Sequence, residues 1–371
     1  LYHLIFVVKI KNNMRVCILG SGLSSLTLAK ALVNQKVYVD LLNSKKTQNL
    51  NKSRTISISK SNLDFFNNNI ININKITWKV KKIYIYSENL KNEKLFNFEN
   101  NNDQLFSIIK NFRLFQILEE SLKKNKFFKK LNTRSNLNFF KNYNFVINTD
   151  YFNPITKKYF NKKITKKYNS FAYTLIIDHQ KILNNTAVQI FTKIGPLAFL
   201  PISNSKTSIV YSVNDLKYSK EYNIKELVKH YNLKYKIKKF SKVEAFELNS
   251  MSLRSYFHNK FLAFGDLLHR VHPLAGQGFN MTIRDIKLLL EIINNKNNLG
   301  LPLDYSVNVE FEKKIKHANF IFENGIDLIY EIFNMERKIK SDKFSKSIKF
   351  FGNYHSVNKM FTKIADKGLL F

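Results

Sequence analysis

Apolar and polar positions along the chain repeat with two different periods. Short apolar runs that end at glycine or polar residues predict buried strands at 15–19, 37–42, 145–150 and 261–264. Longer stretches with apolar residues every three or four positions predict helices at 26–34, 279–293, 305–333 and 344–364. Strands and helices therefore alternate near both ends of the chain, which is typical of an α/β fold.

The middle of the chain has a different pattern. Residues 168–213 are strand-rich, and the clearest apolar runs predict strands at 172–177, 188–191 and 208–212. Residues 78–86 alternate apolar and basic side chains, as one half-exposed strand would, and residues 107–118 predict a strand that runs into an amphipathic helix. Such apolar strands could form the floor of a pocket for an aromatic ring with a lipophilic tail. An ordinary sheet core is the simpler alternative for any single side chain.

A glycine turn joins the first predicted strand to the first predicted helix. Gly20 permits a tight turn, and Gly22 lets the backbone approach a pyrophosphate. Ser25 stands where a dinucleotide fingerprint has its third glycine, and Asn43 stands where an acidic residue would bind a ribose hydroxyl. The strand–turn–helix–strand context predicts a dinucleotide site despite these two departures.

A second turn lies between the strand at 261–264 and the helix at 279–293. Gly265 and Asp266 end the strand, and a carboxylate there can accept hydrogen bonds from sugar-like hydroxyls. Gly276, Gln277 and Gly278 open the helix, whose free N–H groups and positive dipole end favour an anionic ligand. A plain strand–loop–helix with glycines for tight turning is the alternative.

Residues 265–280, with Asp285 after them, resemble the second FAD signature of flavin-dependent aromatic hydroxylases, and especially of the ubiquinone-biosynthesis hydroxylases. The resemblance implies a doubly wound, Rossmann-like FAD-binding domain in three layers, with an inserted β-sheet substrate domain and C-terminal helices. On this basis we expect the FAD-binding domain at 14–75, 106–150 and 258–371, and the substrate domain at 76–105 and 151–257.

The resemblance also implies which residues hold the cofactor. It assigns FAD contacts to Gly20, Gly22, Ser25, Asn43, Arg54, Asp150, Asp266, Pro273, Gly276, Gln277, Gly278 and Asn280. We expect no side chain to act as a catalytic acid or base. We also expect no metal site, because His269 and His272 lack a carboxylate or Cys partner at ligand spacing.

Besides Ser25 and Asn43, three positions near the expected cofactor depart from the resembled family. Tyr151 follows Asp150 where the family has Gly, and a Tyr side chain cannot easily adopt the positive φ that a Gly allows. Leu267 and Leu268 replace two Ala residues. The Tyr in particular puts the ordinary handling of a nicotinamide cofactor in question.

The activity implied by the resemblance is hydroxylation of a lipophilic, polyprenyl-phenol-like ring in ubiquinone biosynthesis. NAD(P)H would reduce FAD, and O2 would add to the reduced flavin to give the hydroperoxyflavin that transfers oxygen. The alternative is a homologue that has lost turnover and serves as a scaffold or partner in a biosynthetic complex. A membrane surface or such a multi-enzyme complex is the expected macromolecular partner.

The formal net charge of +34 suggests nucleic acid or an anionic membrane surface as a partner. However, the excess is nearly all Lys and is dispersed along the chain with Asn, Ile and Phe, as A/T-rich coding would produce. Phosphate and base readers rely on Arg. We therefore expect no nucleic-acid partner.

The single cysteine, Cys17, lies in an apolar run, so we expect a core side chain and no disulfide framework. No apolar run reaches transmembrane length. Residues 1–13 lack the cleavage site of a secretory signal, and we expect them to be an extension before the first strand. These features predict a cytoplasmic protein, with peripheral attachment to the inner membrane as a further expectation.

Overall fold

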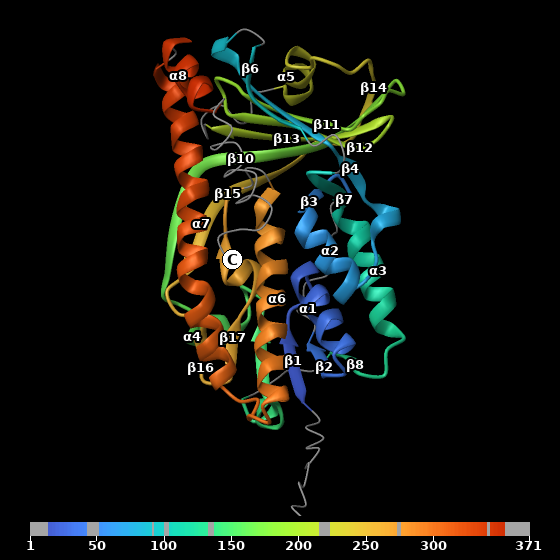
Figure 1. Ribbon diagram of the computed structural model, residues 1–371, viewed down its shortest axis with the longest axis vertical. Coiled ribbons are helices and arrows are strands. Elements are labelled where there is room, and N and C mark those ends of the chain that lie inside the picture. The colour runs from blue at the N-terminus through green and yellow to red at the C-terminus, as the bar shows by residue number, and fades with distance from the viewer. Residues whose placement is uncertain are drawn as a thin grey trace, which may run out of the picture.

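The structure is a computed structural model that describes residues 14–42, 52–90, 93–99, 104–132, 137–214, 223–272, 276–339 and 342–352. Its elements form a mixed α/β fold around three sheets (Figure 1). A largely parallel sheet lies in the lower part of Figure 1, a mainly antiparallel sheet in the upper part, and a small sheet between them.

The six-stranded sheet has the order β16-β17-β9-β1-β2-β8, and only the edge pair β16–β17 is antiparallel. Its strands are β1 (Arg15–Leu19), β2 (Tyr38–Leu42), β8 (Phe128–Leu131), β9 (Phe145–Asn148), β16 (Phe257–His258) and β17 (Phe261–Ala263). The continuous apolar runs predicted as strands are thus central parallel strands, covered on both faces. Cys17 is fully buried in β1, as expected.

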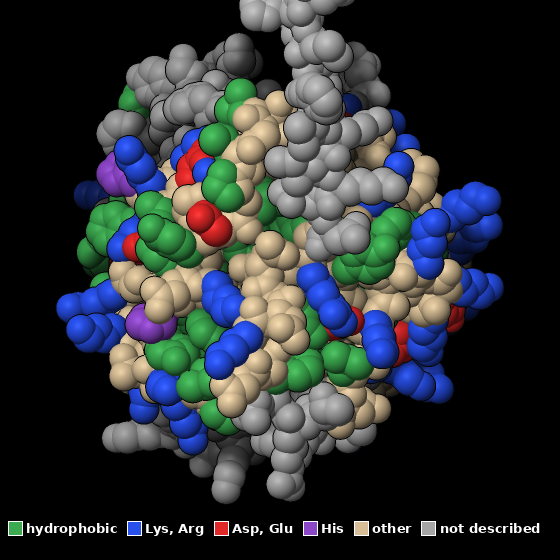
Figure 2. Space-filling view, turned by 90° about the horizontal axis from the view of Figure 1, so that it is seen from below, with side chains coloured by type: hydrophobic (Ala, Val, Ile, Leu, Met, Phe, Trp, Pro, Cys, Tyr) green, Lys and Arg blue, Asp and Glu red, His purple; other side chains and the backbone are tan. Residues whose placement is uncertain are grey.

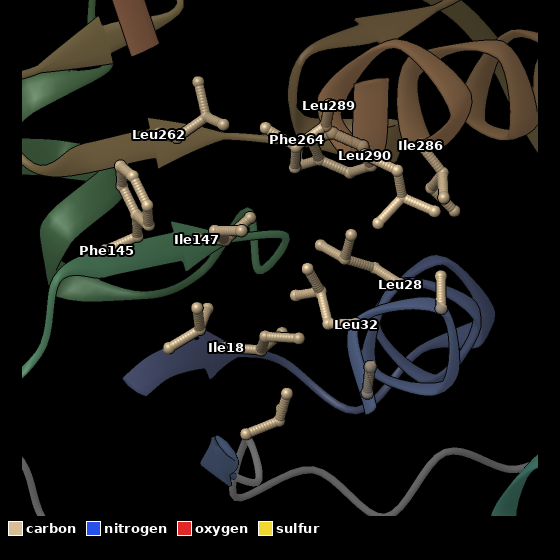
Figure 3. Close-up of a cluster of buried hydrophobic side chains, with 14 of the residues drawn as sticks. Ile18, Leu28, Leu32, Phe145, Ile147, Leu262, Phe264, Ile286, Leu289 and Leu290 are labelled. Carbon is tan, nitrogen blue, oxygen red and sulfur yellow. The ribbon is translucent and has the colours of Figure 1, made fainter. Parts of the chain in front are cut away.

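Helices α1 (Leu23–Asn34) and α6 (Gln277–Asn298) pack together on one face of this sheet. Figure 3 shows Leu28 and Leu32 of α1 directed toward Ile18 of β1, beside Ile147 of β9. From α6, Ile286, Leu289 and Leu290 reach the same cluster, in which every side chain is buried. Because the cluster joins residues from both ends of the chain, it holds the two predicted turns near each other.

The nine-stranded sheet has the order β18-β15-β10-β13-β12-β11-β5-β6, with β14 paired to β10. Its strands are β5 (Lys82–Ser87), β6 (Lys94–Glu99), β10 (Lys163–His179), β11 (Thr186–Phe191), β12 (Pro196–Ser203), β13 (Lys206–Asn214), β14 (Ile237–Phe240), β15 (Glu244–Leu253) and β18 (His269–Arg270). One face packs on α5 (Ile224–His230) through a separate core that includes Leu175, Phe199 and Tyr211.

The third sheet has the order β3-β7-β4, formed by β3 (Thr55–Ser59), β7 (Phe106–Lys110) and β4 (Trp78–Val80). The single strand predicted at 78–86 is wrong: β4 pairs with β7, whereas β5 pairs with β6 and β11. The break falls at Lys81, whose N–H donates to the Asn185 carbonyl at 2.9 Å. Sequence alternation continues across the break, so it could not reveal the change of sheet.

The remaining helices surround these sheets. They are α2 (Lys60–Asn69), α3 (Asn111–Lys123), α4 (Pro154–Tyr159), α7 (Ser306–Ile339), α8 (Asp342–Gly352) and short 3-10 turns that include η4 (Gly265–Leu267). The strand and helix predicted at 107–118 are β7 and α3. The helix predicted at 305–333 extends to Ile339, and the helix predicted at 344–364 is described only as far as Gly352. Among the described helices, none has the length and apolarity needed to cross a membrane.

Candidate functional site

The first predicted turn brings the ends of β1 and β9 to the start of α1. Gly20 has a φ of +113°, and a Cβ at this position would lie 2.4 Å from Thr149 Oγ1. Gly22 is the N-cap residue of α1, and no side chain caps this helix start by a hydrogen bond. The first turn of α1 also holds no acidic residue. The N–H groups at this helix start therefore remain available for an anion, with the helix dipole in its favour.

Ser25 replaces the third fingerprint glycine without disturbing the turn. The residue is fully buried, and its hydroxyl lies 2.6 Å from the Thr149 hydroxyl. Thr149 in turn donates to the Leu19 carbonyl at 3.0 Å. The Ser25 hydroxyl, which a glycine would lack, is thus hydrogen-bonded inside the protein. This hydrogen bond joins α1 to the residue that follows β9.

The second predicted turn packs directly against the first. A Cβ at Gly265 would lie 2.7 Å from the Cβ of Ser24 in the first turn of α1. This close approach places η4, and with it the exposed Asp266, beside the α1 start. A carboxylate that is accessible next to a helix start can accept hydrogen bonds from the hydroxyls of a ligand whose phosphates lie on that helix.

Gly276 and Gly278 differ in what surrounds them. Gly276 precedes α6 with a φ of +62°, and a Cβ there would lie 2.1 Å from Ser57 Oγ. At Gly278, by contrast, no atom of the described residues lies within 4 Å of the position that a Cβ would take. A glycine within a helix costs about 1 kcal/mol relative to alanine. Since packing by the described residues does not require Gly278, the open space beside it fits a ligand that approaches the backbone closely.

Asn280 and Gln277 form the internal support of this helix start. Asn280 is 1% exposed, and its Oδ1 accepts from the Ser59 N–H at 2.9 Å and from Asn62 Nδ2 at 3.0 Å. Its Nδ2 donates to the carbonyls of Ser57 and Gly276 at 3.1 and 3.3 Å. Gln277 accepts from Arg284 at 3.1 Å. The polar atoms of Asn280 all have protein partners, so this residue supports a cofactor site by holding α6 against β3 and α2.

Asp150 and Tyr151 follow β9, at the carboxyl edge of the parallel sheet. Asp150 Oδ1 accepts from the Phe152 N–H at 2.9 Å, and the Asp150 carbonyl accepts from the Thr156 hydroxyl at 2.7 Å. Tyr151 does not adopt a positive φ. The backbone at Tyr151 is therefore free of left-handed strain.

The ring of Tyr151 is packed against cations. Lys163 Nζ donates to the Tyr151 hydroxyl and lies 4.4 Å from the ring centroid, and the Arg270 guanidinium lies 5.9 Å from it. These partners belong to β10 and β18. The Tyr151 ring thus contacts the nine-stranded sheet. It is not among the nearest neighbours of a Cβ placed at Gly20, which are Thr149, Ser25 and the Cβ of Asp150.

Hydroxyl side chains on β3 connect the α6 start with the nine-stranded sheet. Ser57 donates to the Gly276 carbonyl at 3.2 Å, and Thr55 lies 3.0 Å from the Ser208 hydroxyl of β13. Just before the strand, Ser53 lies 3.1 Å from the Thr174 hydroxyl of β10. The sheet face that was expected to be apolar therefore presents hydroxyls here. The alternating hydroxyl residues of segment 53–59 are the sequence signal that could have revealed this face.

Arg54 lies among these contacts. Its guanidinium is exposed and lies 5.8 Å from the ring of Phe246 on β15. The Arg54 carbonyl accepts from the Asn111 N–H at 3.0 Å, which fixes the backbone at the junction of β3 and α3. A cationic side chain is thus placed where β3 meets the nine-stranded sheet.

His269 forms a buried pair with Asp285, a carboxylate partner that its spacing in the sequence does not predict. Its Nε2 lies 2.7 Å from Asp285 Oδ2, and the two side chains are 1% and 0% exposed. Burial lowers the pKa of His269, but the carboxylates of Asp285, Glu323 and Asp266 raise it above its ordinary value overall. Burial raises the pKa of Glu323. The 16-residue separation of His269 and Asp285 carries no local periodicity, so only the fold brings them together.

His272 lies between two tyrosines. Its ring centroid is 4.9 Å from that of Tyr168 on β10 and 4.5 Å from that of Tyr330 on α7. Burial, with the charge of Lys166, lowers the pKa of His272 to about 4. The imidazole is therefore neutral near neutral pH, and its packing joins the signature loop to α7.

Apart from Arg54, the predicted site residues fall into three groups: those outside the described residues, those at the first turn and those at the α6 start. Asn43 and Pro273 lie outside the described residues. No group of three or more potential metal ligands occurs in the part of the chain that the structure describes. By contrast, Gly20, Gly22, Ser25 and Asp150 meet at the first turn, and Asp266 lies beside it. Gly276, Gln277, Gly278 and Asn280 form the α6 start.

This arrangement fits an extended dinucleotide. The α1 start can bind a pyrophosphate, Asp266 can accept from sugar hydroxyls, and the α6 start leaves open space at Gly278 for a flat ring system. FAD has all three parts. The residues present thus match the cofactor that the signature implies.

Comparison with known proteins supports the same assignment. The family model described as FAD binding domain matches residues 160–296. The chain is 29% identical over 153 residues to 3-demethoxyubiquinol 3-hydroxylase of Escherichia coli, and this alignment covers 39% of each protein. It is also 26% identical over 195 residues to ubiquinone biosynthesis monooxygenase COQ6 of Xenopus tropicalis, covering 42% of each.

The chain is thus similar to FAD-dependent hydroxylases and monooxygenases of ubiquinone biosynthesis. The predicted resemblance is thus confirmed. The sequence matches span about two fifths of the length of these two curated hydroxylases.

Two solved structures share this fold over nearly the whole chain. PqsL, a probable FAD-dependent monooxygenase from Pseudomonas aeruginosa, has a TM-score of 0.69 at 13% identity, covering 92% of this chain and 100% of its own. HpxO of Klebsiella pneumoniae, solved with FAD and uric acid, has a TM-score of 0.74 at 10% identity, covering 97% and 98%. The predicted fold class is therefore confirmed.

Proposed function

We propose that this protein is an FAD-dependent monooxygenase that hydroxylates the ring of a polyprenyl-phenol-like substrate in ubiquinone biosynthesis, with NAD(P)H and O2 as co-substrates. The observation that carries the proposal is the close approach of Gly265 to Ser24, which sets the exposed Asp266 beside the α1 start, together with the open space at Gly278 in the first turn of α6. The names of the curated relatives, which are ubiquinone-pathway hydroxylases and monooxygenases, supply the substrate class.

Bound FAD would supply the electron transfer and oxygen chemistry. The α1 start, with Gly20 and Gly22, binds the pyrophosphate, and Asp266 orients the sugar hydroxyls. The α6 start, with its positive dipole end, would stabilise negative charge on a cofactor ring held beside Gly278. No described side chain is assigned the role of catalytic acid or base.

The substrate would lie between the α6 start and the nine-stranded sheet. Residues of the 53–59 segment contact both, through Ser57 at Gly276 and Thr55 at Ser208. Arg54 and Phe246 flank the same region. In this proposal the FAD-binding domain comprises 14–75, 106–150 and 258–371, and the substrate domain comprises 76–105 and 151–257. A lipophilic substrate also favours work at a membrane surface or within a biosynthetic complex.

The cofactor assignment is tested by Asp266→Ala. The purified protein should be yellow with a flavin spectrum, and the variant should bind FAD about 10- to 150-fold more weakly. The reason is that a lost charge-assisted hydrogen bond costs roughly 1.5–3 kcal/mol. Titration with FAD, followed by flavin fluorescence, measures the affinity. Asp64→Ala, at an exposed carboxylate on α2, is the matched control. Equal affinities in all three proteins would refute the assignment.

A second experiment separates the enzyme from a scaffold that has lost turnover. The loaded protein is mixed with NADH or NADPH, O2 and a short-chain prenylphenol, and the hydroxylated product is measured. Product formation supports the proposal. FAD binding without reduction by either nucleotide and without product would support the scaffold alternative.

A further inference from the structure

A row of acidic residues runs along the side of α7 that faces the nine-stranded sheet. Acidic residues are scarce in this chain, where 27 Asp and Glu stand against 61 Lys and Arg, and Figure 2 shows more basic than acidic side chains at the lower end of the molecule. Helix α7 nevertheless places Glu323, Asp327 and Glu331 one turn apart. Residues at this spacing are neighbours on a helix, with Cβ atoms about 5–6 Å apart. We call these three residues the α7 acidic row.

The outer part of this row is held by one strand of the sheet. Tyr168 of β10 donates its hydroxyl proton to Asp327 Oδ1 at 2.5 Å. Lys166 of the same strand has its Nζ 3.4 Å from Asp327 Oδ2 and 3.1 Å from Glu331 Oε1. Figure 1 shows α7 running alongside β10. These contacts fix the two outer carboxylates along the edge of the sheet.

The inner end of the row reaches the buried His269–Asp285 pair. Ser252 stands directly opposite His269 in the pairing of β15 with β18. Burial raises the pKa of Glu323, while the charge of His269 and the Ser252 hydroxyl oppose this rise, so all three groups lie within reach of one another. Among the described residues, Glu323 Oε1 and His269 Nδ1 are buried without a hydrogen-bond partner. Either atom can therefore take up or release a proton without breaking a hydrogen bond.

The exposure of the side chains falls along the row toward the pair. The Glu331 side chain is 43% exposed and that of Asp327 is 28% exposed, whereas those of His269 and Asp285 are 1% and 0% exposed. Carboxyl groups and imidazoles are the side chains that pass protons most readily near neutral pH. A graded series of such groups, from solvent to a buried imidazole, is the arrangement that a proton path requires.

We propose that the α7 acidic row is a proton path, through which the buried His269–Asp285 pair exchanges protons with solvent. A proton enters at Glu331, passes to Asp327 and then to Glu323, and reaches the His269 imidazole, and the reverse route releases it. The alternative is a static network of ion pairs that only holds α7 to the sheet. In that case solvent reaches the imidazole only when α7 opens locally.

The use of the path rests on the proposed function. A hydride delivered by NAD(P)H adds one negative charge to the loaded site, and one proton taken up by the buried groups restores the balance. The charged groups that act on His269 are Asp266 of η4, Asp285 of α6 and Glu323 of α7, and the charge of Glu323 also acts on the buried Tyr256. Because Asp266 faces the proposed ligand and also acts on His269, charge at the cofactor is felt at the inner end of the path.

Proton exchange at His269 tests the path without any cofactor. The full chain carries isotope-labelled histidine, and exchange of the His269 side-chain N–H with solvent is measured by NMR. The signal is assigned by its absence in His269→Gln. Asp327→Asn removes the middle carboxylate of the row, whereas Asp327→Glu keeps a carboxylate there. Glu310→Gln is the matched control, because it also removes an α7 carboxylate that lies 3.0 Å from a lysine, Lys314.

We expect exchange in Asp327→Asn to be at least about tenfold slower than in the wild-type protein, and exchange in Asp327→Glu and Glu310→Gln to stay close to wild type. Faster exchange in Asp327→Asn would overturn the proposal, because it shows that solvent reaches His269 through local opening of α7. Unchanged exchange in that variant, or equally slow exchange in Asp327→Glu, would overturn it too. The measurement needs neither FAD nor substrate, so its failure is distinct from failure of the monooxygenase assignment.

Discussion

At the scale of single residues, the glycines of the site serve different purposes. Gly20 and Gly276 are required by the protein itself, since a Cβ at either would meet Thr149 or Ser57 at a forbidden distance. Gly278 meets nothing among the described residues. The sequence motif does not distinguish these glycines. Their surroundings indicate that Gly20 and Gly276 are needed for folding, whereas Gly278 is needed for a ligand.

This difference makes Gly278→Ala informative. Alanine favours the helix, so we expect the free energy of unfolding without cofactor to stay equal or rise by about 0.5–1 kcal/mol. FAD affinity should fall, because the methyl group occupies the space left for the ligand. Chemical denaturation and FAD titration measure the two quantities. Gly325→Ala in α7, which also has open surroundings, is the control and should leave FAD affinity unchanged. Unaltered affinity in Gly278→Ala would remove the ligand argument.

Tyr151 gives a second prediction at this scale. Its ring contacts Lys163 and Arg270, and its backbone is not strained. We therefore expect Tyr151→Gly not to speed the reduction of flavin by NAD(P)H in anaerobic stopped flow, and to cost about 1 kcal/mol of stability through loosening of the unfolded chain. A faster reduction in the variant than in the wild-type protein would show that the Tyr obstructs the nucleotide.

At the scale of elements, the His269–Asp285 pair joins β18 to α6 within the signature. The pKa of His269 is raised in the folded protein. A protonated His269 therefore adds stability that is complete below the unfolded pKa of about 6.5 and is lost as pH rises through the higher folded value. The pair links cofactor-site geometry to pH without contacting the proposed ligand.

We therefore expect His269→Gln to destabilise the protein more at about pH 6 than at about pH 9, as measured by urea unfolding. Asp285→Asn should cost roughly 3–5 kcal/mol at the lower pH, because it leaves a buried charge unpaired. His317→Gln, at an exposed histidine of α7, should show neither effect. A difference between wild type and His269→Gln that grows with pH would contradict this assignment.

At the scale of the whole molecule, the net charge of +34 is the dominant property. The structure places lysines on many elements and pairs several of them with acidic residues, as in Lys82–Glu99 and Lys130–Glu119. Dispersed, partly neutralised lysines attract polyanions weakly and without specificity.

We therefore expect no dedicated nucleic-acid site. In filter binding, the slope of log affinity against log salt should correspond to fewer than about six phosphate contacts, which is the low end of the range for dedicated binders. Nonspecific retention of nucleic acid at low salt would not change this conclusion, because the slope of affinity against salt is the measured quantity. A steeper slope would establish a nucleic-acid partner.

Local sequence patterns predicted the elements that form the proposed cofactor site. Local apolar runs and glycines predicted β1, α1, β17 and the α6 start, because hydrophobic period and turn chemistry act over a few residues. The sequence by itself could not determine that Ser24 touches Gly265, that Ser57 touches Gly276, or that His269 pairs with Asp285. Those contacts depend on how distant segments pack around a shared core. The same packing decided that 78–86 divides between two sheets and that one side of α7 stays exposed.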